Sequence, residues 1–455
     1  MSLMISVSGV RGIVGKSLTP EVIVKYTSAF GEYCRRGTVI LGRDGRLTGK
    51  SIGHLVSSTL LQMGCNVEAI GICPTPTVAL AVEKLKADGG ISITASHNPM
   101  EWNGLKFFAP TGLFLDAQEN GELWKIAETP ARDYASWDKQ GKHSSIESFV
   151  DDHIKSVLAL SLIKPQKIRK RRLKVVLDCV NAAGGVIVPK LLKKLGCGVV
   201  EINCDVSGVF AHAPEPIPEN LTELCRRVKK ERADLGIAVD PDVDRLVLIN
   251  EKGEPFGEEY TIASVVEFFL SRLPRPKAQG AQVVVNLSTT RAVDDIAKLH
   301  GCNVLRTPVG EINVAKKMKE VKAVVGGEGS GGVIVPELHL GRDALVGIGL
   351  VLQYLADFNG TLSELKQTLP QYSIVKGKVG VANIDTDSAL QRIEQKYAGK
   401  GTVTTTDGLK IDFPDSWVHL RKSNTEPIVR IIAEAPAQNR ADELVHTFTQ
   451  EITQG

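Results

Sequence analysis

The sequence lacks the features that mark membrane and disulfide-rich proteins. It contains no uninterrupted apolar run of about 18 residues, and its first residues show no basic, apolar and small-residue signal pattern. Its 8 cysteines are scattered, without a Cys-x-x-Cys pair or a Cys/His cluster at zinc-site spacing. We therefore predict a cytoplasmic protein with no membrane partner, whose cysteines are small core residues in a reducing compartment.

The sequence also lacks a large excess of charge of either sign. Its 455 residues carry a formal net charge of +3, and 24% of them are charged, as in an ordinary globular protein. This balance predicts no general affinity for nucleic acid. One dense basic run, Lys164–Arg172, could contact nucleic acid. Pro165 interrupts the run and a strand-like segment follows it, which favours a solvated linker between domains.

The chain is too long for one hydrophobic core, and a repeated pattern indicates how it is divided. A prior of about 150 residues per domain predicts three or four domains. Three Gly-Cys dipeptides each end a helix-like stretch and precede a strand, and each copy opens on an apolar strand. The Gly-Cys segments are Met63–Val67, Leu195–Val199 and His300–Val304, and the opening strands are Val39–Gly42, Val175–Asp178 and Val283–Asn286. Strand, helix and strand in this order predict three α/β domains with largely parallel sheets.

The end of the chain follows a different pattern. After about residue 370 the sequence shows short strand-like segments and an amphipathic helix from about Asn439, which predicts a smaller α+β domain. The predicted fold is therefore three similar α/β domains with mixed, largely parallel sheets, plus a C-terminal α+β domain, around a central cleft. The predicted domains are I over 1–150, II over 151–252, III over 253–370 and IV over 371–455.

A distinctive polar loop follows a short apolar strand in each of the three copies. The loops are Thr94-Ala-Ser-His-Asn-Pro99, Asp240-Pro-Asp-Val-Asp-Arg245 and Gly327-Glu-Gly-Ser-Gly-Gly332. Equivalent strand ends in repeated domains can face one shared cleft. We therefore expect the three loops to form a single site.

The first two loops offer a nucleophile and a metal site. Ser96 follows a strand whose end can present its hydroxyl in one fixed geometry, as nucleophilic or phosphoryl-transfer chemistry requires. A Ser/Thr or Asx turn is the plain alternative. Asp240, Asp242 and Asp244 alternate, so a tight turn can direct three carboxylates to one point. Oxygen-only, charge-dense ligation suits Mg²⁺, and a solvated acidic turn is the alternative.

Two further loops suit a sugar and a phosphate. Glu328 and Ser330 lie among glycines, which let a ligand approach the backbone, and a carboxylate accepts hydrogen bonds from paired hydroxyls. In the C-terminal region, Arg421-Lys-Ser-Asn-Thr-Glu-Pro427, with Arg430 close by, combines a guanidinium with hydroxyls, an amide and turn N–H groups. These groups can cradle a phosphate, although a salt-bridged turn is the alternative.

Two cations complete the set of candidate residues. Arg11 lies in the glycine-flanked segment Ser8–Gly12, for which we expect a flexible backbone, and Lys106 follows the serine loop closely enough to share its cleft. Phosphate binders and metal ligands thus occur together. A phosphorylated Ser96 whose oxygen binds Mg²⁺ would use both, so the loops indicate a phosphotransfer site.

In these loops the chain closely resembles the α-D-phosphohexomutases, the family of phosphoglucomutase, phosphomannomutase and phosphoglucosamine mutase. Four segments match in order, across essentially the whole chain: Thr94–Pro99, Asp240–Arg245, Gly327–Gly332 and Arg421–Thr425. The resemblance implies that phospho-Ser96 gives its phosphoryl group to a hexose 1- or 6-phosphate. The bound hexose 1,6-bisphosphate then turns around, and the serine takes back the other phosphate. It also implies Mg²⁺ as cofactor, a hexose 1,6-bisphosphate as activating primer, and a mobile fourth domain.

The resemblance also implies a role for each matched residue. Mg²⁺ is held by phospho-Ser96 with Asp240, Asp242 and Asp244, and the transferring group is surrounded by Arg11, His97, Lys106 and Arg245. The remaining substrate-binding residues are Thr307, Gly310, Glu328 and Ser330 on the sugar side, and Arg421, Ser423, Asn424, Thr425 and Arg430 on the phosphate side. We expect Lys106 to be the general acid/base, since a lysine in a cationic, partly buried cleft can have a lowered pKa.

The preferred sugar stays open at the level of sequence. The sugar loop ends in Gly331-Gly332 where many bacterial relatives carry Gly-His or Ala-His, and Glu311 stands where some hexose-selective members carry histidine. These departures resemble the phosphoglucosamine mutases, but glucose, mannose and glucosamine phosphates all remain candidates. The alternative functions are a sugar-phosphate phosphatase and a catalytically inactive sugar-phosphate-binding regulator. The sequence is compatible with both a monomer and a dimer.

Overall fold

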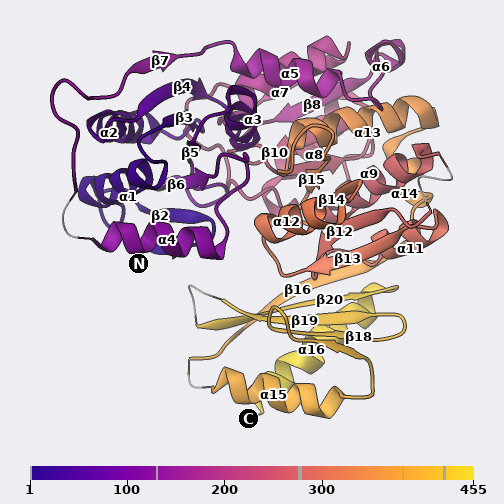
Figure 1. The fold of residues 1–455 in the computed structure, drawn as a ribbon. Helices are drawn as coiled ribbons and strands as arrows, with labels where there is room; N and C mark the ends of the chain where they lie inside the picture. Colours follow the sequence, from indigo (N-terminus) through magenta and orange to yellow (C-terminus); the bar gives the residue numbers. More distant parts are fainter. Residues whose placement is uncertain (1–2, 130–131, 275–278, 383, 424–426, 455) are drawn as a thin grey trace. The chain divides into compact units, whose positions relative to one another are not determined.

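The computed structural model describes residues 3–129, 132–274, 279–382, 384–423 and 427–454. They form four sheets and divide into two compact units (Figure 1). The first unit runs to Thr261 and includes Gly331–Lys366, and the second comprises Ile262–Ser330 and the chain from Gln367 onward. Three sheets are of α/β type and the last is antiparallel, which confirms the predicted fold class. Within the described residues, no helix has both the length and the apolar character that crossing a membrane requires.

The N-terminal sheet has strand order β1-β2-β6-β5-β3-β4-β7, in which β5, β3, β4 and β7 are parallel. Its strands are β1 (Met4–Ser6), β2 (Gly9–Ile13), β3 (Thr38–Arg43), β4 (Asn66–Ile72), β5 (Gly89–Ile93), β6 (Trp102–Phe108) and β7 (His143–Ser145). Its helices are α1 (Pro20–Tyr33), α2 (Gly49–Gln62), α3 (Thr75–Leu85) and α4 (Ala117–Glu128).

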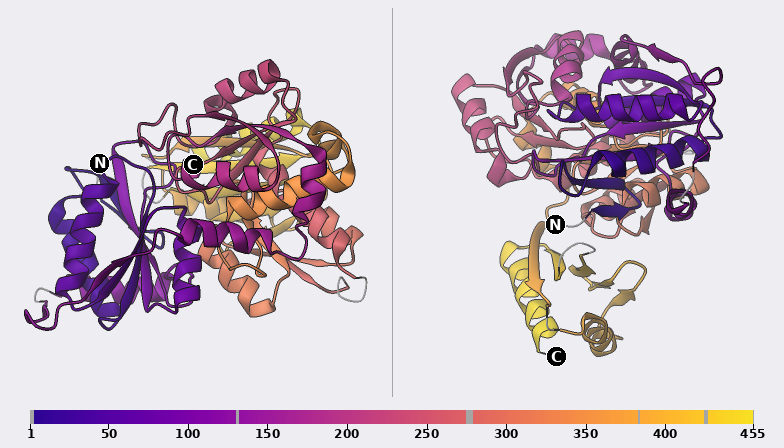
Figure 2. Two further views of the ribbon diagram at one scale, coloured as in Figure 1. Left: turned by 90° about the horizontal axis from the view of Figure 1, so that it is seen from above. Right: turned by 90° about the vertical axis from the view of Figure 1, so that its left-hand side faces the viewer.

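Helices cover both faces of this sheet (Figure 2). On one face α1, α2 and α4 pack around a core that includes Phe30 and Phe107. On the other face α3 lies close to two glycines of the strands: a Cβ at Gly42 would meet Val78 Cγ2 at 2.5 Å, and one at Gly90 would meet Val82 Cγ2 at 2.6 Å. The alternation of large residues on one face and glycine on the other therefore sets how closely α3 approaches.

The second sheet has strand order β11-β10-β8-β9. The elements of this region are α5 (Phe149–Leu158), α6 (Pro165–Arg171), β8 (Lys174–Asp178), α7 (Gly184–Lys194), β9 (Gly198–Ile202), the 3₁₀ turn η1 (Pro218–Asn220), α8 (Thr222–Glu231), β10 (Leu235–Val239) and β11 (Leu246–Ile249). Strands β8, β9 and β10 are parallel, and β11 is antiparallel to β10.

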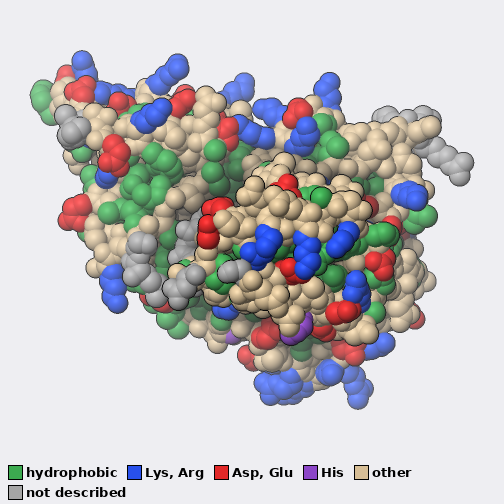
Figure 3. Space-filling view, turned by 90° about the horizontal axis from the view of Figure 1, so that it is seen from below, with side chains coloured by type: hydrophobic (Ala, Val, Ile, Leu, Met, Phe, Trp, Pro, Cys, Tyr) green, Lys and Arg blue, Asp and Glu red, His purple; other side chains and the backbone are tan. Residues whose placement is uncertain are grey.

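Within the basic run Lys164–Arg172, Pro165–Arg171 form helix α6, so the run is helical. Most of its basic side chains are exposed, as the expectation of a solvated segment requires. Pro165 occupies the first helical turn, where its missing N–H costs nothing, and Ile168 is buried. Arg169 donates to the carbonyl oxygen of Lys194, the last residue of α7, with distances of 3.0 Å from Nε and 2.8 Å from Nη2. Part of the basic run therefore caps a neighbouring helix. On the face shown in Figure 3, basic and acidic side chains are mixed.

The third α/β region repeats the arrangement of the first two. Its elements are α9 (Glu258–Arg272), β12 (Gln282–Asn286), α11 (Ala292–Leu299), β13 (Asn303–Thr307), α12 (Glu311–Val321), β14 (Val325–Glu328), β15 (Gly332–Ile334), α13 (Ala344–Phe358) and α14 (Leu362–Gln367). The parallel strands run β4-β3-β5, β9-β8-β10 and β13-β12-β14 in the three copies. Gly64, Gly196 and Gly301, of the three Gly-Cys dipeptides, have φ of +86°, +77° and +70°, and each follows the C-cap residue of its helix. The predicted threefold repeat is therefore confirmed.

The C-terminal sheet is antiparallel throughout, with strand order β16-β20-β19-β18-β17. Its elements are β16 (Ser373–Gly380), α15 (Thr386–Tyr397), β17 (Thr402–Thr404), β18 (Leu409–Asp412), β19 (Trp417–Lys422), β20 (Ile428–Ala435) and α16 (Gln438–Thr453). Helices α15 and α16 supply Ile393 and Phe448 to the core on one face. On the other face, His419 contacts the third region inside the second unit: Ser288 Oγ and His419 Nδ1 lie 2.8 Å apart.

Candidate active site

The first two polar loops meet in the structure. In each copy the loop follows the strand that pairs in parallel with the opening strand, namely β5, β10 and β14. Ser96, after β5, donates through Oγ to Asp240 Oδ2, after β10, at 3.0 Å. Both side chains are buried, at 5% and 0% exposure, although 144 residues separate them in the sequence. The equivalent position of the loops in the repeat therefore brings a serine hydroxyl onto a carboxylate.

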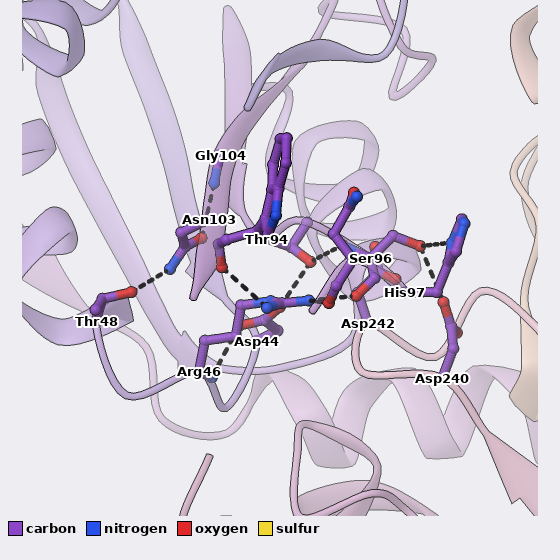
Figure 4. A network of polar contacts seen from close by, with 12 residues as sticks. Asp44, Arg46, Thr48, Thr94, Ser96, His97, Asn103, Gly104, Asp240 and Asp242 are labelled. Atoms are coloured by element: carbon purple, nitrogen blue, oxygen red, sulfur yellow. Dashed lines mark hydrogen bonds and ion pairs between the residues drawn. The ribbon is translucent and has the colours of Figure 1, made fainter. Parts of the chain in front are cut away.

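Ser96 has an unusual backbone conformation that the surrounding hydrogen bonds hold in place. Its φ is +48°, in the left-handed region that non-glycine residues rarely adopt. The backbone N–H of Ser96 donates to Thr94 Oγ1 at 2.9 Å, and Thr94 Oγ1 donates to Asp44 Oδ2 at 2.7 Å (Figure 4). Such strain persists only where neighbouring contacts fix it, and it is common at functional sites.

Arg46 binds the backbone of the loop that carries Ser96. Its guanidinium donates to four carbonyl oxygens, those of Ser96 (2.6 Å), Asn98 (2.6 Å), Pro99 (2.7 Å) and Trp102 (2.9 Å). Asp44 Oδ2 lies 3.1 Å from Arg46 Nε, and both side chains are fully buried. Asp44 and Arg46 are not among the residues predicted from the sequence. Their position directly after β3, at the same edge of the sheet as the serine loop, is the signal that could have found them.

Asp240, Asp242 and Asp244 form a buried carboxylate cluster. Each offers one oxygen within 4.8 Å of the others, and none is more than 1% exposed. Asp242 Oδ1 and Asp244 Oδ1 are buried without a hydrogen-bond partner. Burial raises the pKa of Asp240 well above its ordinary value, and the nearby Asp244 and Asp242 raise it further. An all-oxygen set with excess negative charge and unpaired oxygens fits a hard divalent cation.

Two residues outside the predicted set contact these carboxylates. Thr75 Oγ1, at the start of α3, donates to Asp242 Oδ2 at 2.7 Å. Arg342 Nη2 donates to Asp244 Oδ2 at 2.6 Å. Neither residue belongs to a polar loop of the repeat, so no pattern in the sequence marks them as site residues. They orient two of the three carboxylates, as outer residues of a metal site do.

Lys106 lies on β6 and reaches the same cluster. Its Nζ donates to Asp242 Oδ2 at 2.7 Å and lies 3.6 Å from Asp244 Oδ2. Burial alone would raise the pKa of Asp242, but the charge and hydrogen bond of Lys106 outweigh it and lower that pKa below its ordinary value. The structure therefore brings Lys106 into contact with the predicted metal ligands, and its role as general acid/base stays a prediction.

Two more predicted residues contact the loop that carries Ser96. His97 Nδ1 lies 3.2 Å from Ser96 Oγ, and Arg11 Nη1 donates to Asn98 Oδ1 at 3.0 Å. Arg11 is on strand β2, so the expected flexible backbone is wrong: the pairing of β2 with β6 fixes it. Burial lowers the pKa of His97 well below its ordinary value, and Arg245 and Arg11 add to this effect. The imidazole is therefore neutral at pH 7.

Glu215 was not predicted and contacts two of these residues. Its Oε1 lies 3.7 Å from Arg245 Nη1 and 3.9 Å from His97 Nε2. It belongs to the loop before η1, whose prolines gave no chemical signal in the sequence. The negative charge of Glu215 therefore partly balances the positive charge of Arg245 near the serine loop.

Within the second unit, one of the other predicted sugar residues, Gly310, contacts Glu328. Its side chain is buried at 4% exposure, and Oε1 accepts hydrogen bonds from Asn286 Nδ2 (2.8 Å) and from the Gly310 N–H (3.0 Å). Thr307 ends β13, and its Oγ1 donates to Pro308 O at 3.0 Å. Ser330, two residues beyond Glu328, is partly buried. The turn that contains Gly310 therefore contacts the glutamate of the sugar loop.

Three cations form a row across the C-terminal sheet. Arg421 on β19 is directly opposite Arg430 on β20, and Arg430 is directly opposite Lys378 on β16. Side chains at directly opposite positions point to the same face, and like charges there repel, which an anion would relieve. The Ser423 N–H donates to the Ile428 carbonyl oxygen at 2.9 Å. The predicted residues Asn424 and Thr425 lie outside the described residues.

A second buried cluster combines two histidines with an aspartate. Asp343 Oδ2 lies 2.8 Å from His153 Nε2 and 3.0 Å from His339 Nε2, and His153 Nδ1 lies 2.8 Å from Thr77 Oγ1. Burial alone would raise the pKa of Asp343, but the two histidines hold it well below its ordinary value. Because these distances are those of hydrogen bonds, we interpret the cluster as a network that joins α3, α5 and the start of α13 inside the first unit.

Comparison with known proteins agrees with this geometry. The family descriptions Phosphoglucomutase/phosphomannomutase alpha/beta/alpha domain I, II and III match residues 3–133, 151–253 and 258–372, and the C-terminal domain matches residues 378–451. The chain belongs to the α-D-phosphohexomutase family. It is therefore an isomerase of the phosphohexomutase type, and it carries an aspartate cluster suited to the metal on which the family depends.

Individual relatives match over nearly their full length. A phosphoglucomutase/phosphomannomutase of Thermococcus kodakarensis is 37% identical over 97% of both chains. A probable phosphoglucosamine mutase of Methanopyrus kandleri is 34% identical over 98% of this chain and 96% of its own. The solved structure of a phosphoglucomutase/phosphomannomutase family protein from Burkholderia thailandensis is 28% identical, covers 99% of both chains and superposes with a TM-score of 0.86.

Proposed function

We propose that this protein interconverts hexose 1-phosphates and hexose 6-phosphates by way of a phosphoserine at Ser96. The phosphoryl group leaves Ser96 Oγ as its P–O bond breaks, and a new P–O bond forms to the free hydroxyl of a hexose monophosphate, whose proton passes to a base. The hexose 1,6-bisphosphate then turns around and returns its other phosphoryl group to the serine. The enzyme is thereby regenerated, and the product differs from the substrate only in the position of its phosphate.

The contact between Ser96 and Asp240 is the observation that carries this proposal. A buried hydroxyl lies 3.0 Å from a carboxylate that needs a cation, and the loops of both residues occupy equivalent positions in the repeat. A serine that carried a phosphate would present anionic oxygens at this point. We infer that Asp240, Asp242 and Asp244 hold Mg²⁺ there, where the ion would bind a phosphoserine oxygen and polarise the transferring group.

The residues around Ser96 support transfer in a cationic, partly enclosed site. Arg11, Lys106 and Arg245 can balance the charge on the transferring phosphoryl oxygens. Lys106 Nζ donates to Asp242, which holds the ammonium in a fixed direction, and we propose Lys106 as the group that exchanges the proton with the sugar hydroxyl. His97 is neutral and lies 3.2 Å from Ser96 Oγ, so it can donate or accept a hydrogen bond there.

Residues of the second unit supply the other two functions that the reaction needs. We infer that Glu328 and Ser330, with Thr307 and Gly310, bind sugar hydroxyls, because Glu328 is a buried carboxylate at a glycine-rich backbone. We infer that Arg421, Ser423 and Arg430, with Asn424 and Thr425, bind the phosphate that does not react. One distal-phosphate site can serve both orientations of the bisphosphate, since either phosphate can occupy it while the other reacts.

A coupled assay with purified protein tests this function. Glucose, mannose, glucosamine and N-acetylglucosamine monophosphates are each supplied with Mg²⁺ and a glucose 1,6-bisphosphate primer. The proposal predicts turnover of at least one sugar, a rise in initial rate with the primer, and loss of turnover in Ser96→Ala. Comparable rates on several sugars would show that the enzyme is not selective. Full activity of Ser96→Ala would contradict the proposed mechanism.

The same preparation distinguishes two other functions. A sugar-phosphate phosphatase would release inorganic phosphate steadily without isomerised product. An inactive sugar-phosphate-binding regulator would bind glucose 6-phosphate but would neither turn it over nor carry phosphate on Ser96. The family's mutases and the separate cationic row on the C-terminal sheet both favour the mutase.

We also propose that the enzyme acts in a reducing compartment such as the cytoplasm. All of its 8 cysteines are free thiols, and most are buried.

A further inference from the structure

We propose that Asp407 is a positioning residue that couples recognition of the distal phosphate to recognition of the sugar hydroxyls. This inference rests on the proposed function, because it takes Arg421 as the phosphate-binding residue and Glu328 as the sugar-binding residue. All the residues involved lie in the second unit, which combines most of the third region with the C-terminal domain.

Asp407 lies at a tight turn between β17 and β18, close to the cationic row. The following residue, Gly408, has a φ of +75°, and a Cβ there would meet the Leu420 carbonyl oxygen at 2.2 Å. Only glycine fits this close approach, so the turn is fixed against β19. Asp407 Oδ2 lies 2.9 Å from Arg421 Nε. The turn therefore holds a carboxylate beside the guanidinium at the end of the row.

The same carboxylate contacts the third region. Asp407 Oδ2 accepts a hydrogen bond of 2.8 Å from the Val309 N–H. The next amide in the chain, that of Gly310, donates to Glu328 Oε1 at 3.0 Å. Two consecutive N–H groups thus bind two carboxylates, one from each candidate subsite. The result is a continuous path from Arg421 through Asp407, Val309 and Gly310 to Glu328.

The backbone of Asp407 is also fixed, which makes the path stiff. Its carbonyl oxygen lies 2.7 Å from His419 Nε2, and Ser288 Oγ lies 2.8 Å from His419 Nδ1. His419 is buried at 0% exposure, and burial lowers its pKa to about 4, so the ring is neutral at pH 7. A neutral imidazole donates from one nitrogen and accepts at the other, so Nε2–H donates to Asp407 O and Nδ1 accepts from the serine hydroxyl.

The geometry suits a coupling role better than a merely structural one. Asp407 holds Arg421 by an ion pair at Nε that lacks hydrogen-bond geometry, while a guanidinium has five N–H donors in a rigid fork. The N–H donors of Arg421 are therefore not used by Asp407, and the ion pair keeps the guanidinium beside the turn. A shift of Arg421 on phosphate binding would pull on the same carboxylate that binds Val309, and so move the turn that holds Glu328.

The test uses Asp407→Asn, which keeps the shape and an acceptor for Val309 but removes the charge that fixes Arg421. Asp415→Asn is the matched control, because Asp415 is an exposed aspartate in the neighbouring turn of the same sheet, bonded to Ser416 Oγ. Glucose 6-phosphate binding is measured by calorimetry in a Ser96→Ala background, where turnover does not interfere, and kcat and KM are measured with Ser96 intact.

We expect Asp407→Asn to raise Kd and KM for the sugar phosphate by about 10-fold or more, because Arg421 loses the charge that holds it in place, with a smaller change in kcat. Asp415→Asn should behave as the parent protein. A double-mutant cycle combines Asp407→Asn with Glu328→Gln. The factor by which the double variant raises Kd should be at least about 3-fold smaller than the product of the two single factors.

Two outcomes would overturn the proposal: unchanged affinity in Asp407→Asn, or single effects that multiply without coupling. If Asp407→Asn unfolds at a lower temperature than the parent, the same double-mutant cycle is measured with Asp407→Glu, which keeps the charge. A parent protein that binds glucose 6-phosphate normally but fails to isomerise it would refute the proposed function, while the binding cycle would still test Asp407.

Discussion

The guanidinium of Arg46 donates a hydrogen bond of 2.6 Å to the carbonyl oxygen of Ser96. The arginine thus fixes the backbone of the residue whose side chain we propose to carry the phosphate, without touching the hydroxyl. Asp44 completes the arrangement by binding both Arg46 and Thr94. A buried ion pair is in this way used to hold a strained serine in the left-handed region, at a φ of +48°.

Replacing Arg46 should therefore affect both stability and catalysis. Arg46→Met should lower the free energy of unfolding by about 3–5 kcal/mol, because it leaves the buried Asp44 carboxylate without its partner. Arg46→Lys keeps the charge but cannot reach four carbonyl oxygens, so kcat should fall by about 100-fold through misplacement of Ser96. The measurements are urea unfolding and the coupled assay.

Arg36→Lys is the control for Arg46, since Arg36 forms a surface ion pair with Asp133 in the same domain. It should change the unfolding free energy by less than about 1 kcal/mol. A normal kcat in Arg46→Lys would show that the hydrogen bonds to the loop carbonyls are not required to position the serine.

Removing the hydroxyl of Thr75 should weaken metal binding. Thr75 Oγ1 donates to Asp242 Oδ2, and outer partners of metal ligands typically contribute 10- to 100-fold in affinity. Thr75→Val should raise the Mg²⁺ concentration for half-maximal activity by about 10-fold. Thr59→Val, which removes a buried hydroxyl bonded to the Leu55 carbonyl oxygen in α2, should leave that concentration unchanged. The same Mg²⁺ dependence in both variants would argue against a metal on Asp242.

The network around Asp343 should contribute strongly to the stability of the first unit. Asp343→Asn should lower the free energy of unfolding by about 3–5 kcal/mol at pH 7, because two buried histidines lose their shared acceptor. The pKa of Asp343 is lowered in the folded state, so the stabilisation is present above the unfolded pKa of about 4 and is lost as the pH falls further. Urea unfolding between pH 7 and 3 should therefore show a steeper acid limb for the parent than for the variant. Parallel curves would contradict this assignment.

His419 should make the free energy of unfolding of the second unit depend on pH, in a higher pH range than Asp343 does for the first unit. Its folded pKa is about 4, below the unfolded value of about 6.5, so the unfolded chain takes up the proton first as the pH falls. The parent should lose up to about 3 kcal/mol of stability between pH 6.5 and 4, and His419→Gln should lose less. The difference between the two urea midpoints at pH 7 and pH 4.5 measures this effect. An equal loss in both proteins would mean that His419 is protonated in the folded state.

The threefold repeat and the loops that carry Ser96 and Asp240 could be predicted from the sequence because local signals recur. A helix that ends in Gly-Cys and a polar loop that follows an apolar strand occur once in each repeat of the fold. The residues that hold the loops are different. Arg46, Thr75 and Arg342 contact residues that are 50, 167 and 98 positions away in the sequence, respectively. Sequence spacing does not report such contacts.

A local pattern can have more than one structural outcome. Most basic side chains of Lys164–Arg172 are exposed as expected, but Pro165 and Ile168 give the run a helix with a favourable start and one buried residue, which charge alone does not predict. Arg11 was expected on a flexible backbone because glycines flank it, but strand pairing with β6 fixes these residues. Glycine and charge permit a loop without requiring one.

The transfer of phosphate to and from Ser96 tests the central claim most directly. The protein is incubated with Mg²⁺ and glucose 1,6-bisphosphate, separated from the sugar, and analysed by intact mass and peptide mapping, before and after addition of glucose 6-phosphate. We predict one phosphate on Ser96 that is lost to the added monophosphate with formation of the bisphosphate, and no phosphate on Ser96→Ala. Isomerisation by a protein that never carries phosphate on Ser96 would contradict the account.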